Sequence, residues 1–324
     1  MGLGAARRTV LVTGAAGFLG SHLVDRLLAE GNEVIGLDNL VTGTLENLAD
    51  AMKSPRFHFE LGDVRETIGV YAEQIFNFAC PASPVHYQAD PYFTLTTSVT
   101  GIQRVIEAAR GRKCVIVQAS TSEVYGDPLV HPQPESYWGH VNPIGERACY
   151  DEGKRCAETL LFDARRRWGV DARVVRIFNT YGPRMALDDG RVVSNFVVQA
   201  LEKTPLTIYG DGSQTRSFCY ASDLIEGIVS MTRPAVVDGP VNIGNPHEFT
   251  IKQLAELVSE LLGGAEVVYK PLPSDDPKQR KPDITRARQI LGFEPKVALR
   301  DGLDALIRDI RGRLSQRPRR AAAP

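Results

Sequence analysis

The sequence predicts an α/β fold, in which a doubly wound parallel sheet is joined to a smaller C-terminal substrate-binding lobe. Through the first half, short apolar runs alternate with helical patterns, which is typical of the βαβ units that build parallel sheets. A glycine-rich turn directly follows the first apolar run. After Phe178 the regular alternation weakens, and loops rich in glycine and proline separate shorter helical patterns.

Six apolar runs in the first half are predicted to be buried strands, because they are short and continuous. These runs are Thr9–Val12, Glu33–Leu37, Arg56–Glu60, Gln74–Phe78, Val115–Gln118 and Arg173–Ile177. Between the first two, leucines recur at helical spacing from Leu19 to Leu28. Gly31 is expected to end that helix, as glycine often does at a C-terminus.

The composition excludes several classes of function. The net charge of -1, with acids and bases interspersed, gives no basic surface for nucleic acid or a membrane. No apolar run is long enough to span a bilayer, and the start is too short for a signal peptide. The five cysteines are scattered, as in a reducing cytoplasm, and no cluster has metal-ligand spacing. We expect a cytoplasmic protein without a metal site.

The glycine-rich turn contains Gly14, Gly17 and Gly20, and it opens the first predicted helix. Glycines there permit a tight turn and let backbone amides approach a pyrophosphate at the positive helix end. A plain turn would have the same spacing, so the context decides. Asp38 ends the second predicted strand, where an acid binds the ribose hydroxyls of the adenosine. Because a carboxylate repels a 2′-phosphate, NAD is favoured over NADP. Asp63 either binds the adenine or caps a turn.

These features predict the domain boundaries. Residues 1–178 form a Rossmann-type NAD-binding domain, and 179–314 form most of the substrate-binding lobe. The chain is expected to return to the main sheet near 218–245, with a strand at Val241–Ile243. The basic, low-complexity segment 315–324 is expected to be a disordered tail.

Tyr150 and Lys154 lie one turn apart on one face of a predicted helix. Such a pair can lower the pKa of the tyrosine, which then accepts the proton of a reacting hydroxyl, while the lysine holds the nicotinamide ribose. Thr121 would hydrogen-bond that hydroxyl. Strand alternation would point Thr121 and Glu123 to the same side. Hydride transfer does not need Glu123, so this carboxylate either carries the specific function or is a surface acid beside a turn.

Several long motifs resemble one family. They are Ala79-Cys80-Pro81-Ala82-Ser83-Pro84, Ser120-Thr121-Ser122-Glu123-Val124-Tyr125-Gly126-Asp127-Pro128, Tyr137-Trp138-Gly139-His140-Val141-Asn142-Pro143-Ile144-Gly145, Cys149-Tyr150-Asp151-Glu152-Gly153-Lys154-Arg155, Arg176-Ile177-Phe178-Asn179-Thr180-Tyr181-Gly182-Pro183-Arg184-Met185, Asp189-Gly190-Arg191-Val192-Val193-Ser194-Asn195-Phe196 and Arg280-Lys281-Pro282-Asp283-Ile284. From about Arg8 to about Arg311 the chain resembles the UDP-glucuronate decarboxylases (UDP-xylose synthases) among the extended short-chain dehydrogenases/reductases.

The resemblance implies that NAD oxidises C4 of the glucuronate, that CO₂ leaves the 4-keto intermediate, and that re-reduction gives UDP-xylose. It implies catalytic roles for Thr121, Tyr150 and Lys154, and decarboxylation roles for Glu123 and Arg280. Without the resemblance, the sequence around Arg280 would predict a solvated charge. The implied substrate contacts are Tyr87, Thr121, Ser122, Asn179, Arg191 and Arg216. The implied NAD contacts are Gly14, Gly17, Phe18, Leu19, Asp38, Asn39, Leu40, Thr42, Gly43, Asp63, Val64, Ala79, Thr97, Tyr150 and Lys154.

The chain also departs from its relatives. Thr96 and Ser98 stand where relatives usually carry lysine and asparagine, and Gly69-Val70 replaces a bulkier pair. These changes leave the reaction class intact and bear on substrate preference and product release. The resemblance further implies a homodimer, formed through the helices near 99–110 and 150–167.

Alternatives from two classes remain. A sugar-nucleotide 4,6-dehydratase would need an acid where Ser122 stands, and a 4-epimerase needs no carboxylate at Glu123. A decarboxylase that releases UDP-4-keto-pentose needs the same residues, so it stays open. A non-enzymatic NAD-binding regulator on the same fold is disfavoured by the intact threonine, tyrosine and lysine set.

Overall fold

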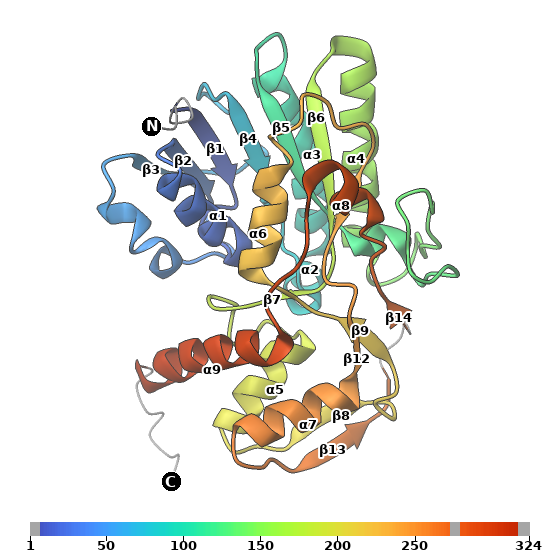
Figure 1. The fold of residues 1–324 in the computed structure, drawn as a ribbon. Helices are drawn as coiled ribbons and strands as arrows, with labels where there is room; N and C mark the ends of the chain where they lie inside the picture. The colour runs from blue at the N-terminus through green and yellow to red at the C-terminus, as the bar shows by residue number, and fades with distance from the viewer. Residues whose placement is uncertain (1–6, 273–278, 317–324) are drawn as a thin grey trace.

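The computed structural model describes residues 7–272 and 279–316. Seven parallel strands form the central sheet, in the order β11-β6-β5-β4-β1-β2-β3 (Figure 1). They are β1 (Thr9–Thr13), β2 (Glu33–Asp38), β3 (Phe57–Leu61), β4 (Gln74–Asn77), β5 (Val115–Thr121), β6 (Asp171–Ile177) and β11 (Val241–Ile243). The predicted fold class is confirmed, and each strand predicted in the first half is present, with ends that differ by up to three residues.

The strand order reverses between β1 and β4. From β1 the chain moves outward through β2 and β3, then returns to the other side of β1 and moves outward again through β4, β5 and β6. At such a reversal the connections leave in opposite directions, which opens a crevice beyond the carboxyl ends of the two strands. The fold itself therefore provides a binding crevice at β1 and β4.

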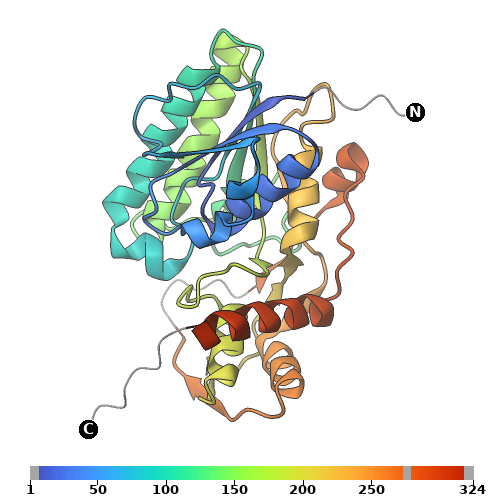
Figure 2. The same cartoon turned by 90° about the vertical axis from the view of Figure 1, so that its left-hand side faces the viewer.

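Helices cover both faces of the sheet (Figures 1 and 2). One face carries α2 (Pro84–Ala89), α3 (Pro91–Ala109) and α4 (Ala148–Trp168), and the other carries α1 (Phe18–Ala29), α6 (Ala221–Ser230) and α8 (Thr285–Leu291). Side chains of β1 point alternately to the two faces of the sheet. Val10 and Val12 enter the core beneath α1, whereas Leu11 enters the core beneath α3.

The C-terminal lobe has its own apolar core and lies below the sheet in Figure 1. Its helices are α5 (Val192–Leu201), α7 (Ile251–Leu261) and α9 (Leu299–Gln316), which pack with the strands β8 (Leu206–Tyr209) and β13 (Val267–Lys270). Short strands lie between lobe and sheet: β12 (Glu248–Thr250), β9 (Thr215–Ser217) and β14 (Gln279–Arg280) form one small sheet, and β10 (Cys219–Tyr220) pairs with β7 (Thr180–Tyr181). Three 3₁₀ turns complete the elements: η1 (Leu45–Leu48), η2 (Ala51–Lys53) and η3 (Ser122–Tyr125).

The chain returns twice to the main sheet. The first return contains α6 and β11, and β11 pairs with β6. The second contains α8, where Ile284 and Ala287 enter the core beneath α1 and α6; the sequence pattern did not indicate it. Ser315 and Gln316 belong to α9 rather than to the expected tail, whose remaining residues, 317–324, lie outside the described part.

Among the described residues, no helix has the length and apolarity needed to cross a membrane. The same residues contain no group of three or more histidine, cysteine, aspartate or glutamate side chains arranged to hold a metal ion. All five cysteines are free.

A buried polar network connects α4 to the edge of the sheet. The guanidinium of Arg176 donates to both carboxylate oxygens of Glu158 at 3.0 and 2.8 Å, and also to the hydroxyl of Tyr125 at 3.0 Å. That hydroxyl donates to Asn242 on β11 at 2.7 Å, and Ser120 donates to Glu158 at 2.5 Å. Buried charges need such partners, because removal of one leaves the other desolvated and uncompensated.

We therefore expect Glu158→Gln to lower the free energy of unfolding by about 3 kcal/mol, since Arg176 would lose its counter-charge. The matched control is Glu294→Gln, which removes an exposed partner of Arg288 and should cost under about 1 kcal/mol. Urea unfolding at neutral pH measures both. Equal costs for the two variants would contradict a special role for the buried pair.

Candidate active site

The glycine-rich turn packs tightly against the end of β4. Gly14 has φ +69°, and a Cβ atom there would lie 2.7 Å from the backbone carbon of Phe78. At Gly20 a Cβ would lie 1.9 Å from the Gly14 carbonyl oxygen. Asp38 holds the turn in place, because its Oδ2 accepts a hydrogen bond from the backbone N–H of Ala16 at 2.9 Å. Glycine is therefore required where the first strand passes into α1.

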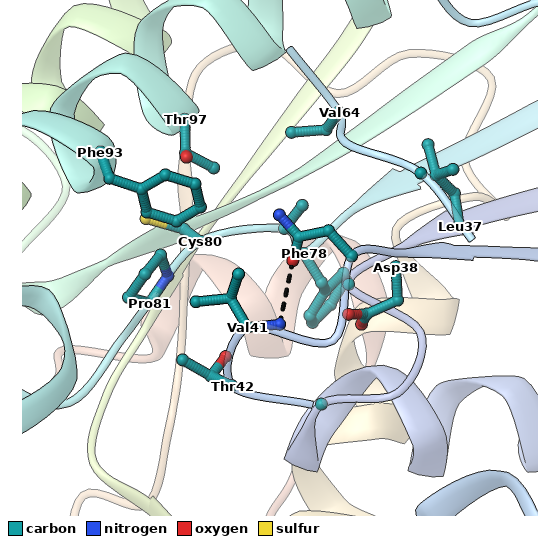
Figure 3. Close-up of a pocket in the computed structure, with 15 residues that line it drawn as sticks. Leu37, Asp38, Val41, Thr42, Val64, Phe78, Cys80, Pro81, Phe93 and Thr97 are labelled. Atoms are coloured by element: carbon teal, nitrogen blue, oxygen red, sulfur yellow. Dashed lines mark hydrogen bonds between the residues drawn. The ribbon is translucent and has the colours of Figure 1, made fainter. Parts of the chain in front are cut away.

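An open pocket lies beside this turn, at the carboxyl ends of β1, β2 and β4 (Figure 3). Eight of the residues expected around NAD line it: Gly14, Gly17, Asp38, Asn39, Thr42, Val64, Ala79 and Thr97. The hydroxyl of Thr97 is buried and has no hydrogen-bond partner among the described residues. The pocket thus coincides with the crevice that the strand order creates.

Four other expected cofactor residues are not among those that line the pocket. Phe18 and Leu19 begin α1, and Leu40, at φ 59°, donates its backbone N–H to Asp38 Oδ1 at 2.8 Å. Gly43 lies against Ala16, where a Cβ would come within 2.9 Å.

Asp63 accepts hydrogen bonds from the Arg65 backbone at 2.9 Å and from the Asn39 side chain at 3.0 Å. Burial alone would raise the pKa of Asp63, but hydrogen bonds from Arg65 lower it overall. The turn-capping interpretation of Asp63 therefore accounts for its contacts in this structure.

Sequence reasoning missed part of the pocket lining, including Cys80, Pro81 and Phe93. The first two lie in the loop that follows β4 at the strand-order reversal, so their position in the chain was a usable signal. Figure 3 shows Phe93, Cys80 and Thr97 gathered at one end of the pocket and Asp38 toward the other. The guanidinium of Arg65 lies 4.4 Å from the Phe93 ring centre and 3.4 Å from the Thr96 hydroxyl, so a positive charge lies beside the position where the resemblance predicts a lysine.

Two of the hydroxyls that the sequence predicts to be catalytic meet at the end of β5. Thr121 is its last residue, and its hydroxyl interacts with that of Tyr150 on α4. The expected strand alternation between Thr121 and Glu123 is wrong, because the strand ends and η3 begins. The Thr121 hydroxyl instead accepts the backbone N–H of Glu123 at 3.1 Å. The tight turn, rather than an extended strand, places the carboxylate beside the hydroxyls.

Tyr150 does not have the lowered pKa that its spacing from Lys154 suggests. Burial raises the pKa of Tyr150 well above its ordinary value, and nearby Cys80 and Glu123 add to the rise. The Lys154 ammonium lies 5.7 Å from the Tyr150 ring centre and donates to the Ala119 carbonyl at 3.0 Å. In this structure, desolvation of the phenol therefore outweighs the attraction of the ammonium.

Glu123 is held between two arginines. One oxygen accepts from Arg280 Nη1, and the other accepts from Arg147 Nη2 and, at 3.4 Å, from Arg280 Nη2. Burial alone would raise the pKa of Glu123, but Arg280 and Arg147 together lower it to about 2. Two guanidinium groups on one carboxylate leave a net positive charge in a site that is largely shielded from water.

Considered by sequence spacing alone, Arg280 was expected to be a solvated charge. This expectation is wrong, because its side chain is buried on β14. Sequence reasoning missed Arg147. Its position, three residues before Tyr150 and directly before α4, places it one turn from the phenol, and that spacing was the available signal.

The expected substrate residues surround this centre. Tyr87 stacks on Tyr150 with ring centres 5.0 Å apart, and its buried hydroxyl has no hydrogen-bond partner among the described residues. Ser122 is buried beside Glu123. On the lobe side, Arg216 on β9 is the register partner of Arg280 on β14.

Arg191 and Asn179 lie at the lobe boundary. The Arg191 guanidinium lies 5.9 Å from the Phe18 ring centre and donates to Asp189 at 2.8 Å. Asn179 lies between β6 and β7, and its carbonyl accepts from Cys219 at 2.9 Å. The main sheet and the lobe thus contribute to one site.

Comparisons with known proteins agree with this geometry. The model of the NAD dependent epimerase/dehydratase family matches residues 10–244. Among solved structures, a UDP-glucose 4-epimerase from Thermotoga maritima has a TM-score of 0.87 at 30% identity, covering 94% of this chain and 99% of that one. A UDP-glucuronic acid 4-epimerase from Bacillus cereus, in complex with UDP-glucuronic acid and NAD, has a TM-score of 0.84 at 29% identity, with the same coverage.

More similar relatives narrow the assignment. UDP-glucuronic acid decarboxylase 1 of Arabidopsis thaliana is 54% identical over 315 residues, which is 97% of this chain and 72% of that protein. UDP-glucuronic acid decarboxylase 1 of Xenopus tropicalis is 48% identical over 95% of this chain and 73% of its own length. The chain therefore belongs to the NAD dependent epimerase/dehydratase family and, within it, to the UDP-glucuronic acid decarboxylases.

Proposed function

We propose that this protein converts UDP-glucuronate to UDP-xylose and CO₂, through oxidation at C4, decarboxylation and re-reduction with NAD. The observation that carries this proposal is the Arg147–Glu123–Arg280 cluster beside the Thr121–Tyr150 pair. The pair serves oxidation of an alcohol, and the net positive cluster attracts a carboxylate on the same substrate. The names and high identity of the plant and vertebrate relatives support the same reaction.

The residues of the pocket fit NAD. Close packing at Gly14 and Gly20 leaves no room for a side chain, and the Thr97 hydroxyl lacks a partner among the described residues. Asp38 would face the adenosine ribose from the end of β2, and the start of α1 would face the pyrophosphate. When bound, NAD supplies the oxidant for C4 and the reductant for its return, and its cationic ring favours an ionised phenol nearby.

The three catalytic side chains have separate tasks. Thr121 would orient the C4 hydroxyl, and Tyr150 would take its proton and later return it. The Lys154 ammonium carries three hydrogens and donates one to Ala119, so two remain for the ribose beside the ring. The burial that raises the Tyr150 pKa also makes this pKa sensitive to any cation placed against it.

Decarboxylation follows from the position of the ketone. A ketone at C4 is β to the C6 carboxylate, so the electron pair of the C5–C6 bond can move into an enolate as CO₂ leaves. Arg280 and Arg147 would hold the carboxylate before this step. With a pKa of about 2, Glu123 is ionised at neutral pH, so it orients the two guanidinium groups and does not itself provide a proton.

The alternatives are less well supported. Ser122 occupies the position where a dehydratase would need an acid, and a 4-epimerase has no use for the Glu123 cluster. Release of UDP-4-keto-pentose before re-reduction uses the same residues and remains an outcome of the assay.

Further parts of the proposal concern the assembly and the substrate contacts. We place Tyr87, Thr121 and Ser122 against the sugar, and Asn179, Arg191 and Arg216 against the uridine diphosphate. We also propose a cytoplasmic homodimer through α3 and α4, and Tyr92 and Leu95 are exposed apolar residues on α3 that would support such an interface.

The first test is product analysis. Purified protein with NAD and UDP-glucuronate should release CO₂ and form UDP-xylose, and Tyr150→Phe should slow both by about 1,000-fold because the C4 hydroxyl loses its base. Mass spectrometry of the nucleotide sugar and trapping of CO₂ measure these products. Absence of CO₂ from the unmodified protein would refute the proposal, whereas CO₂ with accumulated ketopentose would indicate early release.

The second test removes the charge of Glu123. Glu123→Gln should retain NAD binding yet lower CO₂ release by about 100-fold, because Arg147 and Arg280 lose the group that orients them. The matched control is Glu146→Gln, an exposed carboxylate beside Arg147, which should keep full activity. Normal CO₂ release by Glu123→Gln, with NAD binding and thermal stability intact, would remove Glu123 from the mechanism.

A further inference from the structure

The proposed reaction consumes one proton in each turnover. Tyr150 takes a proton from the C4 hydroxyl and returns it to the same oxygen, so it supplies no net proton in a turnover. Loss of CO₂ leaves an enolate, and C5 then gains a hydrogen that the substrate did not bring. A second group must supply this proton. The family resemblance gives Glu123 a role in decarboxylation, but its two guanidinium partners keep it ionised.

Asp151 is a second carboxylate in the same cluster, because it lies one helical turn after Arg147 and both Glu123 and Arg280 act on its ionisation. It follows Tyr150 on α4, its residue is only 6% exposed, and its Oδ1 is buried without a hydrogen-bond partner among the described residues. Two further buried polar atoms around the cluster also lack partners there, the hydroxyl of Tyr87 and Nε of Arg280. Unpartnered polar atoms are costly in a protein interior, so three in one cluster indicate a place for ligand or water.

Charged groups from several elements influence Asp151. Glu123 in η3 and Glu152 on α4 oppose its ionisation, whereas Arg147 before α4 and Arg280 on β14 favour it. Burial is the largest influence, and together these effects raise the pKa of Asp151 to about 7. The same cluster thus contains one carboxylate that is ionised and another that carries a proton near neutral pH, a division typical of acid–base sites.

We propose that Asp151 supplies, by way of water in this cluster, the proton that ends on C5 after CO₂ has left. The C5–C6 electron pair becomes part of the enolate and then forms the new C5–H bond. Asp151 becomes a carboxylate and regains a proton from solvent before the next turnover. The proposal deepens the proposed function and rests on it.

A pH profile with isotope exchange tests the proposal. For the unmodified protein, kcat for UDP-xylose formation should decline above about pH 7, because Asp151 must be protonated to act. In Asp151→Asn, kcat at pH 6.5 should be at least about tenfold lower, and the decline should be absent. Incubation of UDP-xylose with the NAD-loaded protein in D₂O should place deuterium at C5, and Asp151→Asn should slow this exchange to a similar extent. Asp163→Asn, which removes an exposed carboxylate farther along α4, is the matched control and should change neither readout.

A stability measurement supplies a readout that does not depend on turnover. The pKa of Asp151 in the folded protein lies above its ordinary value, so the folded state binds the proton more tightly and loses stability as pH rises toward about 7. Asparagine cannot ionise. The Tm of Asp151→Asn relative to the unmodified protein should therefore increase between pH 5 and pH 8, and a constant difference would contradict the buried, proton-binding carboxyl.

The outcomes separate the two proposals. No CO₂ from the unmodified protein would refute the proposed function itself. Turnover by the unmodified protein, with an unchanged pH profile and unchanged C5 exchange in Asp151→Asn, would overturn only the role of Asp151. If Asp151→Asn does not fold, Asp151→Glu retains the acid and should keep the decline with a shifted midpoint; an unmoved midpoint would overturn the role as well.

Discussion

The attachment of one carboxylate to two guanidinium groups organises the whole site. Glu123 in η3 binds Arg147, which directly precedes α4, and Arg280, which lies on β14. These three segments are distant in the chain, and one of them belongs to the small sheet between lobe and main sheet. A buried charge is stable only beside an opposite charge, so each of the three groups requires the others. The ion pair between Glu123 and Arg280 therefore holds the small sheet and the lobe against the end of β5. The surplus positive charge would then favour an anionic sugar, as the proposed function requires.

The topology divides the chemistry between two places. The strand-order reversal at β1 and β4 opens the pocket that fits NAD, while the end of β5 and the start of α4 carry Thr121, Tyr150 and Lys154. Both places lie along the same carboxyl edge of the sheet, so an oxidant and a base can reach one substrate carbon. The charge cluster lies beyond them, toward the lobe, where the rest of a nucleotide sugar would extend.

The pKa values of the ionisable groups of the site move in opposite directions, although burial acts on all of them in the same direction. Burial raises the pKa values of Tyr150 and Asp151, whereas the pKa of Glu123 falls because two adjacent cations outweigh the same effect. In such surroundings a single added charge, such as a cationic ring or a substrate carboxylate, moves proton affinities strongly. Binding of the reactants would therefore adjust the acids and bases that act on them.

The sequence by itself determined the fold class, the strands of the first half and the glycine turn with Asp38, and it supplied the candidates for hydride transfer. These features depend on local patterns: apolar runs, a turn that only glycine permits, and a tyrosine one helical turn from a lysine. The second return of the chain through α8 could not be predicted, since a short helix contains little periodicity.

Tertiary structure alone decided the electrostatics. Spacing suggested a lowered pKa for Tyr150 and a solvated Arg280, but pKa and burial depend on which distant residues share the interior. The position of Glu123 likewise depends on a turn that the sequence pattern did not indicate. Arg147 and Asp151 gain their charged neighbours only where η3, α4 and β14 pack together. A chain pattern specifies what each residue can do locally, whereas the partners of a buried charge come from long-range packing.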